Sequence, residues 1–333
     1  MRSRLFRVAA SLAILWGVIT LAFFINHALP SDPARMVAGP HARPADVARI
    51  RDQLGLSRPP LEQYARFMRQ LVHLASADLK AIDHATCESV GPLHVDLGRS
   101  YQQHRPVVRI IAERAPRSLL LACAAAFIQF TLGSLFGTLA ALRKNSVFDT
   151  ATVGMTLLGM SAPTFLIGIV LQIIFAKELG LLPLDGYGVT AWEHARSLIL
   201  PALTLGIFGA AYTTRIVRDS MIAILSNDYI RSARAKGGSL LRVVVVHAFR
   251  NALIPLVTIV GVDLGALVGG AVVTESLFRW PGIGALTVRA ALDRDGPVLM
   301  GTVVVSAGAM IAMSIVVDVL CAWIDPKGRV PSI

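Results

Sequence analysis

Six long runs of hydrophobic residues dominate the chain, and shorter polar stretches separate them. A hydrocarbon core about 30 Å thick requires about 20 mostly apolar residues in helical form. The runs that approach or exceed this length cover residues 8–29, 118–142, 150–176, 197–214, 252–274 and 296–317. The pattern therefore predicts an all-α polytopic membrane protein with six transmembrane helices, and the mean hydropathy of +0.62 agrees with that class.

The first hydrophobic run follows Arg2, Arg4 and Arg7, as a secretory signal would. It is longer than the apolar core of about 7 to 15 residues found in signal peptides, so we expect a retained membrane anchor. Lys and Arg residues are concentrated at the N-terminus and within 215–250. Because cytoplasmic loops carry such an excess, the sequence predicts that both termini and the 219–250 loop are cytoplasmic.

The sequence predicts three parts: the N-terminus with the first helix (1–29), an external segment (30–117) and a five-helix core (118–333). The external segment is too apolar at helical spacing for a linker, and we expect a helical cap. One amphipathic helix should follow Pro44 and end at Gly55, and a second should follow Pro60. Its apolar positions are Leu61, Tyr64, Phe67, Leu71 and Leu74. Residues 79–97 suggest a hairpin, and 107–115 an interfacial helix leading into the second span.

The charge and the cysteines narrow the function further. A net charge of +11 in a soluble protein would suggest a nucleic-acid partner, but here the cations border apolar runs and suit anionic lipid headgroups. Cys87, Cys123 and Cys321 are far apart, so the sequence indicates neither a disulfide framework nor a CxxC metal site.

The polar stretch 228–255 has the features of ordered structure although it lies between two apolar runs. Asn227 or Asp228 can cap a short helix, and Gly237 stands where a helix ends in a left-handed residue. Ser239 can cap a second helix that continues into the next span. The sequence therefore predicts a helix, a sharp turn and a second helix on one face of the membrane.

Two sequences in this stretch, DYIRSARAKG at 228–237 and HAFRNALIP at 247–255, resemble the cytoplasmic coupling loop of ABC transporter permeases. Where the broader family begins this loop with Glu-Ala-Ala, the chain has Arg231, Ser232 and Ala233. The missing Glu and the long distance from Gly237 to Pro255 favour the dipeptide and oligopeptide branch. An ordinary basic loop held by anionic lipid is the alternative.

Further landmarks of the peptide permeases extend the resemblance over nearly the whole chain. They are LPSDP at 29–33, LGL at 54–56, QY at 63–64, DLGRS at 96–100, ESLFRWPGIG at 275–284, RDGP at 294–297 and DVLCAWIDPK at 318–327. The resemblance implies a type I ABC importer permease of the bacterial inner membrane, forming half of a pore. It also implies a second homologous permease, two ATPase subunits and an external substrate-binding protein as partners. Residues 76–94 look like an insertion, to which no role is assigned.

No sequence in the chain fits a nucleotide-binding P-loop, a zinc protease or a serine hydrolase. We therefore expect that the chain is not an enzyme and binds no cofactor. The energy for transport should come from a separate ATPase. The loop could dock into a groove on that partner, with Ala233 allowing close approach and Gly237 a sharp exit. Its basic residues could face either an acidic partner or lipid. The residues assigned to ATPase coupling are Tyr229, Arg231, Ala233, Arg234, Ala235, Lys236, Gly237, Arg250 and Asn251.

Asp263 is the one charged residue inside a predicted span. A carboxylate near the membrane midplane is costly and by default faces a polar pathway or a partner, so we assign Asp263 to the substrate pathway. The alternative is a protonated carboxyl that is hydrogen-bonded within a helix interface. Gly261, Gly265 and Gly269 of the same helix form two GxxxG steps that permit tight helix packing. The family resemblance places a neutral polar residue here, so Asp263 is a departure that could tune charge preference.

Two rival functions stay open at this point. A secondary transporter or channel without an ATPase should show inverted repeats, broken helices or several buried charges, and the sequence offers one buried Asp. A membrane-embedded hydrolase would need a nucleophile with a base, and we find no candidate. The family resemblance favours peptides as the solute and leaves nickel and glutathione open.

Overall fold

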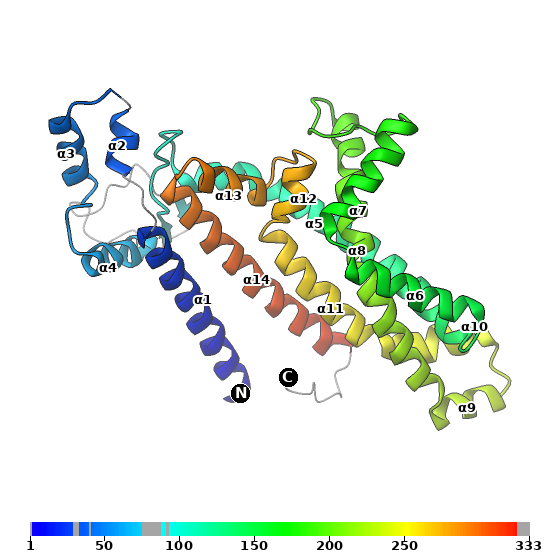
Figure 1. The fold of residues 1–333 in the computed structure, drawn as a ribbon. Helices are drawn as coiled ribbons and strands as arrows, with labels where there is room; N and C mark the ends of the chain where they lie inside the picture. The colour runs from blue at the N-terminus through cyan, green and yellow to red at the C-terminus, as the bar shows by residue number, and fades with distance from the viewer. Residues whose placement is uncertain (1, 29–32, 40, 75–87, 91–92, 325–333) are drawn as a thin grey trace. The chain divides into compact units, whose positions relative to one another are not determined.

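The computed structural model describes residues 2–28, 33–39, 41–74, 88–90 and 93–324 (Figure 1). The chain divides into two compact units. The first unit comprises Met1–Arg117 and Gly282–Gly308, and the second comprises Ser118–Pro281 and Ala309–Ile333. The predicted insertion 76–94, with Cys87, lies largely outside the described residues.

The first unit begins with the long helix α1 (Arg2–Ala28) and continues through the short helices α2 (Pro33–Ala38), α3 (Pro44–Gln53) and α4 (Pro60–Leu71). Both predicted amphipathic helices are present. Each begins at a proline, whose missing N–H is harmless in the first turn. Gly55, with φ +69°, follows the end of α3 as expected. Leu74 was wrongly assigned to the second helix, because α4 ends at Leu71.

A small antiparallel sheet follows α4. Its strands are β1 (Val72–Leu74), β2 (Glu88–Val90) and β3 (Leu93–Val95), in the order β1-β3-β2. The β2–β3 pair lies within the region predicted as a hairpin, and β1 adds a third strand by pairing with β3. Long-range pairing of this kind cannot be read from local alternation.

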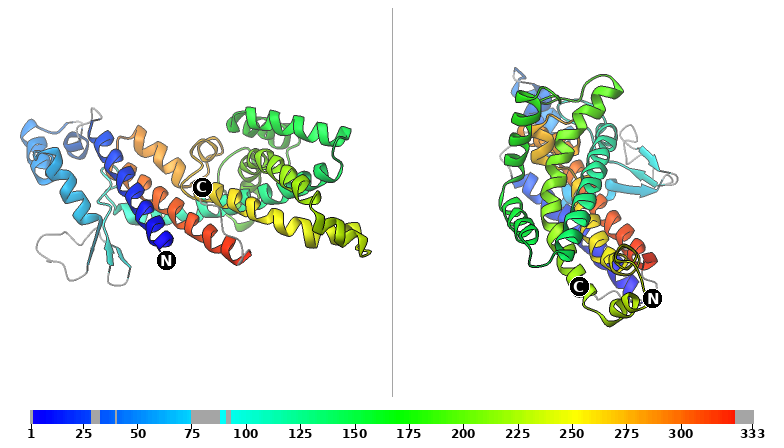
Figure 2. Two further views of the ribbon diagram at one scale, coloured as in Figure 1. Left: turned by 90° about the horizontal axis from the view of Figure 1, so that it is seen from below. Right: turned by 90° about the vertical axis from the view of Figure 1, so that its right-hand side faces the viewer.

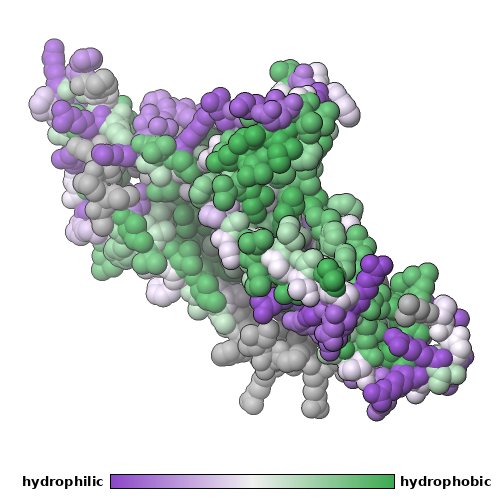
Figure 3. Space-filling view, turned by 45° about the vertical axis from the view of Figure 1, so that its right-hand side comes forward, coloured by the Kyte–Doolittle hydropathy of each residue, from purple (hydrophilic) through white to green (hydrophobic). Residues whose placement is uncertain are grey.

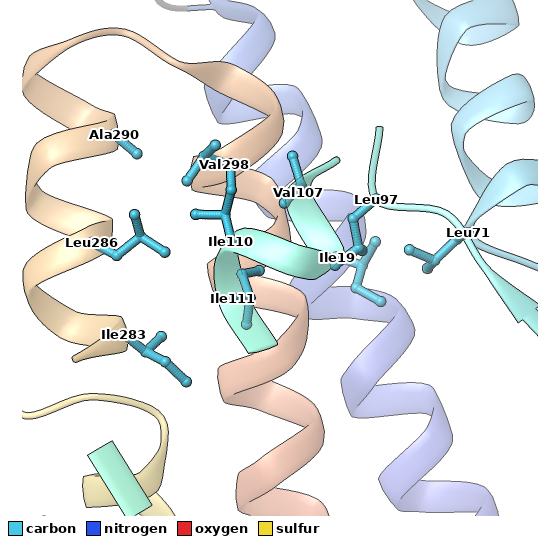
Figure 4. Packing of buried hydrophobic residues seen from close by; sticks show 10 residues of the cluster. All are labelled: Ile19, Leu71, Leu97, Val107, Ile110, Ile111, Ile283, Leu286, Ala290 and Val298. Atoms are coloured by element: carbon cyan, nitrogen blue, oxygen red, sulfur yellow. The ribbon is translucent and has the colours of Figure 1, made fainter. Parts of the chain in front are cut away.

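The core of the first unit combines α1, the segment after β3, the start of α5 (Val107–Leu142), α13 (Ile283–Leu292) and the start of α14 (Gly296–Ile324). Figure 4 shows its buried side chains, which are Ile19, Leu71, Leu97, Val107, Ile110, Ile111, Ile283, Leu286, Ala290 and Val298. Buried Asp295 holds the same region together. It accepts hydrogen bonds from Ser100 Oγ (2.5 Å), Tyr101 N (3.2 Å) and Gln102 N (3.3 Å). Two family landmarks distant in sequence thus meet at one carboxylate.

Every regular element in the described part of the second unit is a helix. Its elements, beyond the rest of α5 and α14, are α6 (Val147–Ser161), α7 (Thr164–Leu171), η2 (Gln172–Glu178), α8 (Ala191–Leu225), α9 (Asp228–Ala235), α10 (Leu240–Arg242), η3 (Val243–Phe249), α11 (Arg250–Val268) and α12 (Val272–Leu277). The segments η2 and η3 are π-helical. Helix α8 is central, and α6, α7 and α11 pack on it (Figures 1 and 2).

Five helices of the described chain are long and apolar enough to cross a membrane, and the total is six if the bent pair of α6 with α7–η2 counts as one span. Hydrophobic side chains cover much of the visible surface, while hydrophilic ones lie along the upper and lower edges of the view (Figure 3). The predicted class, an all-α polytopic membrane protein, is confirmed.

Three predicted helix boundaries differ from the structure, two of them because of proline and glycine. The expected span 150–176 bends by 106° between α6 and α7. Ala162, before Pro163, takes an extended conformation (φ −78°, ψ 130°), as the proline ring demands. The expected span 252–274 ends at Val268, because Gly270 has φ +115° and α12 starts anew. Conversely, the expected interfacial helix 107–115 is part of one 36-residue helix that continues through Pro116.

Glycines let the long helices of the second unit approach closely. On α8, a Cβ at Gly206 would lie 2.6 Å from Ile128, and one at Gly209 would lie 2.5 Å from the Gln129 side chain. On α11, Gly261 faces Val317 and Gly265 faces Met313 of α14. Small residues are the usual means of tight packing between membrane helices. The tight packing predicted from the GxxxG steps is therefore present at Gly261 and Gly265.

Candidate functional site

Helix α9 is the centre of the predicted coupling loop and lies directly beyond the end of α8 (Figure 1). Ile230 anchors it. This side chain is fully buried in a cluster with Val217, Met221, Val243 and Ala252. Burying such a side chain contributes about 1.5–3 kcal/mol. The anchor was missed by the sequence reasoning, although Ile230 is the lone branched apolar residue in a polar helix. It fixes which face of α9 points outward.

The turn after α9 has the geometry of a Schellman C-cap. Gly237 N donates to Arg234 O (2.9 Å) and Gly238 N donates to Ala233 O (3.2 Å). Gly237 has φ +82°, as predicted, and a Cβ there would meet open space. At Gly238, in contrast, a Cβ would lie 2.9 Å from Ala233 O. Glycine is therefore required at the two positions for different reasons. Gly237 allows the left-handed backbone conformation, and Gly238 allows close packing against Ala233 O.

The two helices on either side of the turn differ in their N-terminal caps. Asn227 occupies the N-cap position of α9 but makes no capping hydrogen bond through its side chain. Ser239 caps the second helix, since its Oγ accepts from Arg242 N at 3.4 Å. The predicted order of helix, turn and helix is confirmed, and the second helix runs through η3 into α11.

All but one of the residues assigned to coupling are exposed. They are Tyr229, Arg231, Arg234, Ala235, Lys236, Gly237, Arg250 and Asn251. Tyr229 and Asn251 are joined by a hydrogen bond of 2.8 Å from Asn251 Nδ2 to Tyr229 Oη, which ties α9 to the start of α11. Ala233 is half-buried against the Ile230 cluster, so it is more involved in internal packing than was expected.

An ion pair that the sequence reasoning missed joins α6 to α8 near this end of the second unit. Arg218 holds Asp149 with two hydrogen bonds, Nε to Oδ1 (2.5 Å) and Nη2 to Oδ2 (2.9 Å). Asn145 N donates to the same carboxylate at 2.9 Å. The side chains of Asp149 and Arg218 are only 5% and 19% exposed. The pair thus fixes the helix that leads into α9 against its neighbour.

Asp263, the predicted pathway residue, lies on α11 and is half-buried. Gln129 of α5 donates through Nε2 to Asp263 Oδ2 (2.6 Å) and to Thr213 Oγ1 of α8 (3.0 Å). Gln129 and Thr213 are buried, with exposed fractions of 2% and 0%. Both amide hydrogens of Gln129 are therefore used, and its position is fixed by the close approach of Gly209.

A cavity of about 480 Å³ opens beside Asp263 within the second unit. Its walls come from α5, α6, α7, α8, α11 and α12. They are mostly apolar, and the lining residues include Met160, Leu205, Phe208, Tyr212, Ala266 and Val272. Asp263 is thus hydrogen-bonded between helices and also lines a cavity, so the two sequence interpretations are compatible. Within the described residues, no group of three or more His, Cys, Asp or Glu side chains could hold a metal ion.

Several apolar helices of membrane-spanning length place the chain among polytopic membrane proteins, and helices of the second unit line a cavity. Residues 133–330 match the family described as binding-protein-dependent transport system inner membrane component, and residues 1–122 match its N-terminal counterpart. The chain belongs to this family. It is a permease subunit of an ABC importer, and such a subunit works with ATPase and substrate-binding partners.

Two similar proteins match nearly the whole chain, and a solved structure matches about two thirds of it. A putative peptide transport system permease protein of Brucella abortus (strain 2308) is 38% identical over 328 residues, which is 97% of each chain. The glutathione transport system permease protein GsiC of Salmonella typhi is 37% identical over 323 residues, again 97% of each chain. An inward-facing structure of the MetNI methionine ABC transporter aligns with a TM-score of 0.53 and 17% identity, covering 66% of this chain and 98% of that chain. This last likeness supports the fold.

Proposed function

We propose that the chain forms half of a translocation pore for peptides or related small solutes, driven by separate ATPase subunits that act on the 228–238 helix and turn. Names of the relatives support this solute class, since they include peptide and glutathione transport permeases. The observation that carries the coupling role is the construction of α9. One apolar side chain anchors it internally, and its basic face is left outside.

A helix built in this way can transmit force. Ile230 and the Tyr229–Asn251 hydrogen bond attach α9 to η3 and α11, so a push on its outer face moves those helices. Helix α11 carries Asp263 and lines the cavity. We infer that closure of a bound ATPase changes the cavity through this connection. A short helix resting in a partner groove is a common mode of recognition.

The charge on α9 suits a partner with an acidic groove. Arg231, Arg234 and Lys236 are exposed, and Arg250 adds a fourth cation at the start of α11. Such charges raise the rate of docking and fix its register more than they raise affinity. Anionic lipid would use the same cations, and the experiment below separates the two because lipid contact does not depend on a groove.

We further propose the assembly and topology that belong to this function: a second homologous permease, two ATPases and an external binding protein, with both termini cytoplasmic. The distribution of basic residues supports the orientation. On intact spheroplasts, a membrane-impermeant thiol reagent should label Cys87, which the orientation places outside, and spare Cys321. Labelling of Cys321 with Cys87 spared would reverse the topology.

A transporter or channel that works without an ATPase is the rival. The bend between α6 and α7 is a broken helix of the kind such proteins use. Such a transporter should also have several buried charges, whereas among the described residues the cavity is lined by one carboxylate, Asp263. The family membership likewise favours the ABC importer.

The coupling role is tested by placing acidic groups on the outer face of α9. Ala235 is exposed, so Ala235→Asp leaves the internal packing intact. A Cβ at Gly237 meets open space, but the φ of +82° disfavours other residues, so Gly237→Asp adds backbone strain of about 1–2 kcal/mol to the new charge. We expect both proteins to insert normally, to lose the ATPase subunit in pulldown and to lose uptake. Ala48→Asp on α3, also exposed, is the matched control and should change neither.

Two results would count against the proposal. Normal uptake with both acidic variants would remove the coupling role, and loss of membrane insertion would show that α9 is a folding element. Retained ATPase binding with lost uptake would place the defect in transmission rather than docking.

A further inference from the structure

The cavity beside Asp263 is lined by a single carboxyl group. Of its fifteen lining residues, Asp263 is the one Asp or Glu, and none is Lys, Arg or His. Among the described residues, no basic side chain forms a salt bridge with Asp263. A carboxylate in mostly apolar surroundings without a counter-ion is unfavourable, and a cation that enters the cavity would relieve this cost.

The hydrogen bonds of Asp263 leave half of the carboxylate available. Gln129 Nε2 occupies Oδ2, and no described residue donates to Oδ1. Because Gln129 also donates to Thr213 Oγ1, its amide cannot turn its oxygen toward the carboxylate without losing both bonds. Gln129 and Thr213 therefore hold the carboxylate in one orientation and act as positioning residues.

Two aromatic side chains line the same cavity as Asp263. Phe208 and Tyr212 line the same cavity and lie four residues apart on α8, so they share one helix face. Their exposed fractions are 38% and 45%. Aromatic faces attract organic cations, with a contribution that grows when water is excluded. A carboxylate and two aromatic rings in an apolar cavity form a set of groups suited to an ammonium or guanidinium.

We propose that this cavity is a recognition site for the cationic group of the transported solute, with Asp263 as its ligand. The inference rests on the proposed function, because it assigns the solute that the pore favours. The volume of about 480 Å³ lies in the range of small-molecule sites and accommodates a side chain or a very short peptide. Solutes with an amine or guanidinium should therefore pass faster than acidic ones of the same size.

The first test measures uptake of trilysine, trialanine and triglutamate by the complete transporter. Because the external binding protein also selects solutes, each variant is compared with the wild type in the presence of the same binding protein. Asp263→Asn should lower the trilysine-to-trialanine uptake ratio by about tenfold, the factor that corresponds to one lost ion pair of about 1.4 kcal/mol. Gln129→Leu should lower the ratio by less, since the carboxylate stays but loses its fixed orientation.

Asp318→Asn is the matched control. It removes the same charge from an exposed position of α14 that does not line the cavity, and the uptake ratio should stay unchanged. An unchanged ratio in Asp263→Asn, with uptake otherwise normal, would overturn the site. A wild type that imports none of the three peptides would instead refute the peptide function, and the second test then decides the site.

The second test uses the purified full chain in lipid nanodiscs and needs no transport. Dicyclohexylcarbodiimide modifies carboxyl groups in apolar surroundings, and mass spectrometry reports the modified residue. n-Butylammonium should slow labelling of Asp263 several-fold, whereas n-butanol, of nearly the same size but uncharged, should not. Equal labelling rates with the two probes would overturn the cation site whatever the solute proves to be.

Discussion

Removing the arginine of the Asp149–Arg218 pair tests how α6 is held against α8 in the second unit. Arg218→Met keeps an unbranched side chain about as long as the aliphatic stem of arginine and deletes the guanidinium. Asp149 then keeps the hydrogen bond from Asn145 N and loses both bonds from Arg218. Because the Asp149 side chain is 5% exposed, its charge stays buried without a counter-ion. Breaking a buried pair in this way costs about 3–5 kcal/mol, and we expect the lower end because Arg218 is 19% exposed.

A double-mutant cycle isolates the pair from the rest of the packing. Asp149→Leu should destabilise the protein by less, since the guanidinium keeps its exposed pair with Asp219. The double variant Asp149→Leu with Arg218→Met should lose much less than the sum, because no buried charge remains. The assay is denaturant unfolding of the purified protein in detergent, followed by circular dichroism.

Asp219 provides an internal control on the same guanidinium. It accepts from Arg218 Nη1 at 2.9 Å, but its side chain is 59% exposed. Exposed pairs are worth about 0–1 kcal/mol, so Asp219→Asn should change the free energy of unfolding by no more than that. If the two single variants of the buried pair add to within about 0.5 kcal/mol in the double variant, the residues are independent and the reasoning fails.

Three further predictions concern contacts that each lie within a single unit. Asp295→Ala leaves its three hydrogen-bond donors without an acceptor and should cost at least about 2 kcal/mol, seen as faster hydrogen exchange of the Tyr101 amide. Burial and the nearby Asp295 raise the pKa of the Tyr101 phenol to about 12, so its contribution to stability is complete below about pH 10 and is lost as the pH rises through 12. Ultraviolet difference absorbance should show this late ionisation, and Asp295→Asn should bring it to lower pH. Gly261→Val brings the new side chain against Val317 and should destabilise the α11–α14 contact by about 1–3 kcal/mol. Gly154→Val, which has open space around it, is the control and should not destabilise the protein. Equal thermal unfolding of the two variants would contradict the packing.

Local chemistry determined much of this protein from the sequence alone. Hydrophobic runs of membrane-spanning length located the spans, because an apolar bilayer leaves a helix few alternatives. The left-handed conformation of Gly237 and the Ser239 cap were predicted because they depend on residues only a few positions apart. The exposed basic residues of α9 were recognised for the same reason.

The tertiary structure decided the rest, since it joins residues whose separation no periodic pattern records. Arg218 and Asp149 are 69 residues apart, Gln129 and Asp263 are 134 apart, and Ser100 and Asp295 are 195 apart. Each is an ordinary polar residue until folding places its partner within hydrogen-bonding distance in a setting of low dielectric. Helix α9 and its turn could therefore be found from the sequence, while the carboxylate that faces the cavity gained its partners, and its proposed ligand, only from the packing of three helices.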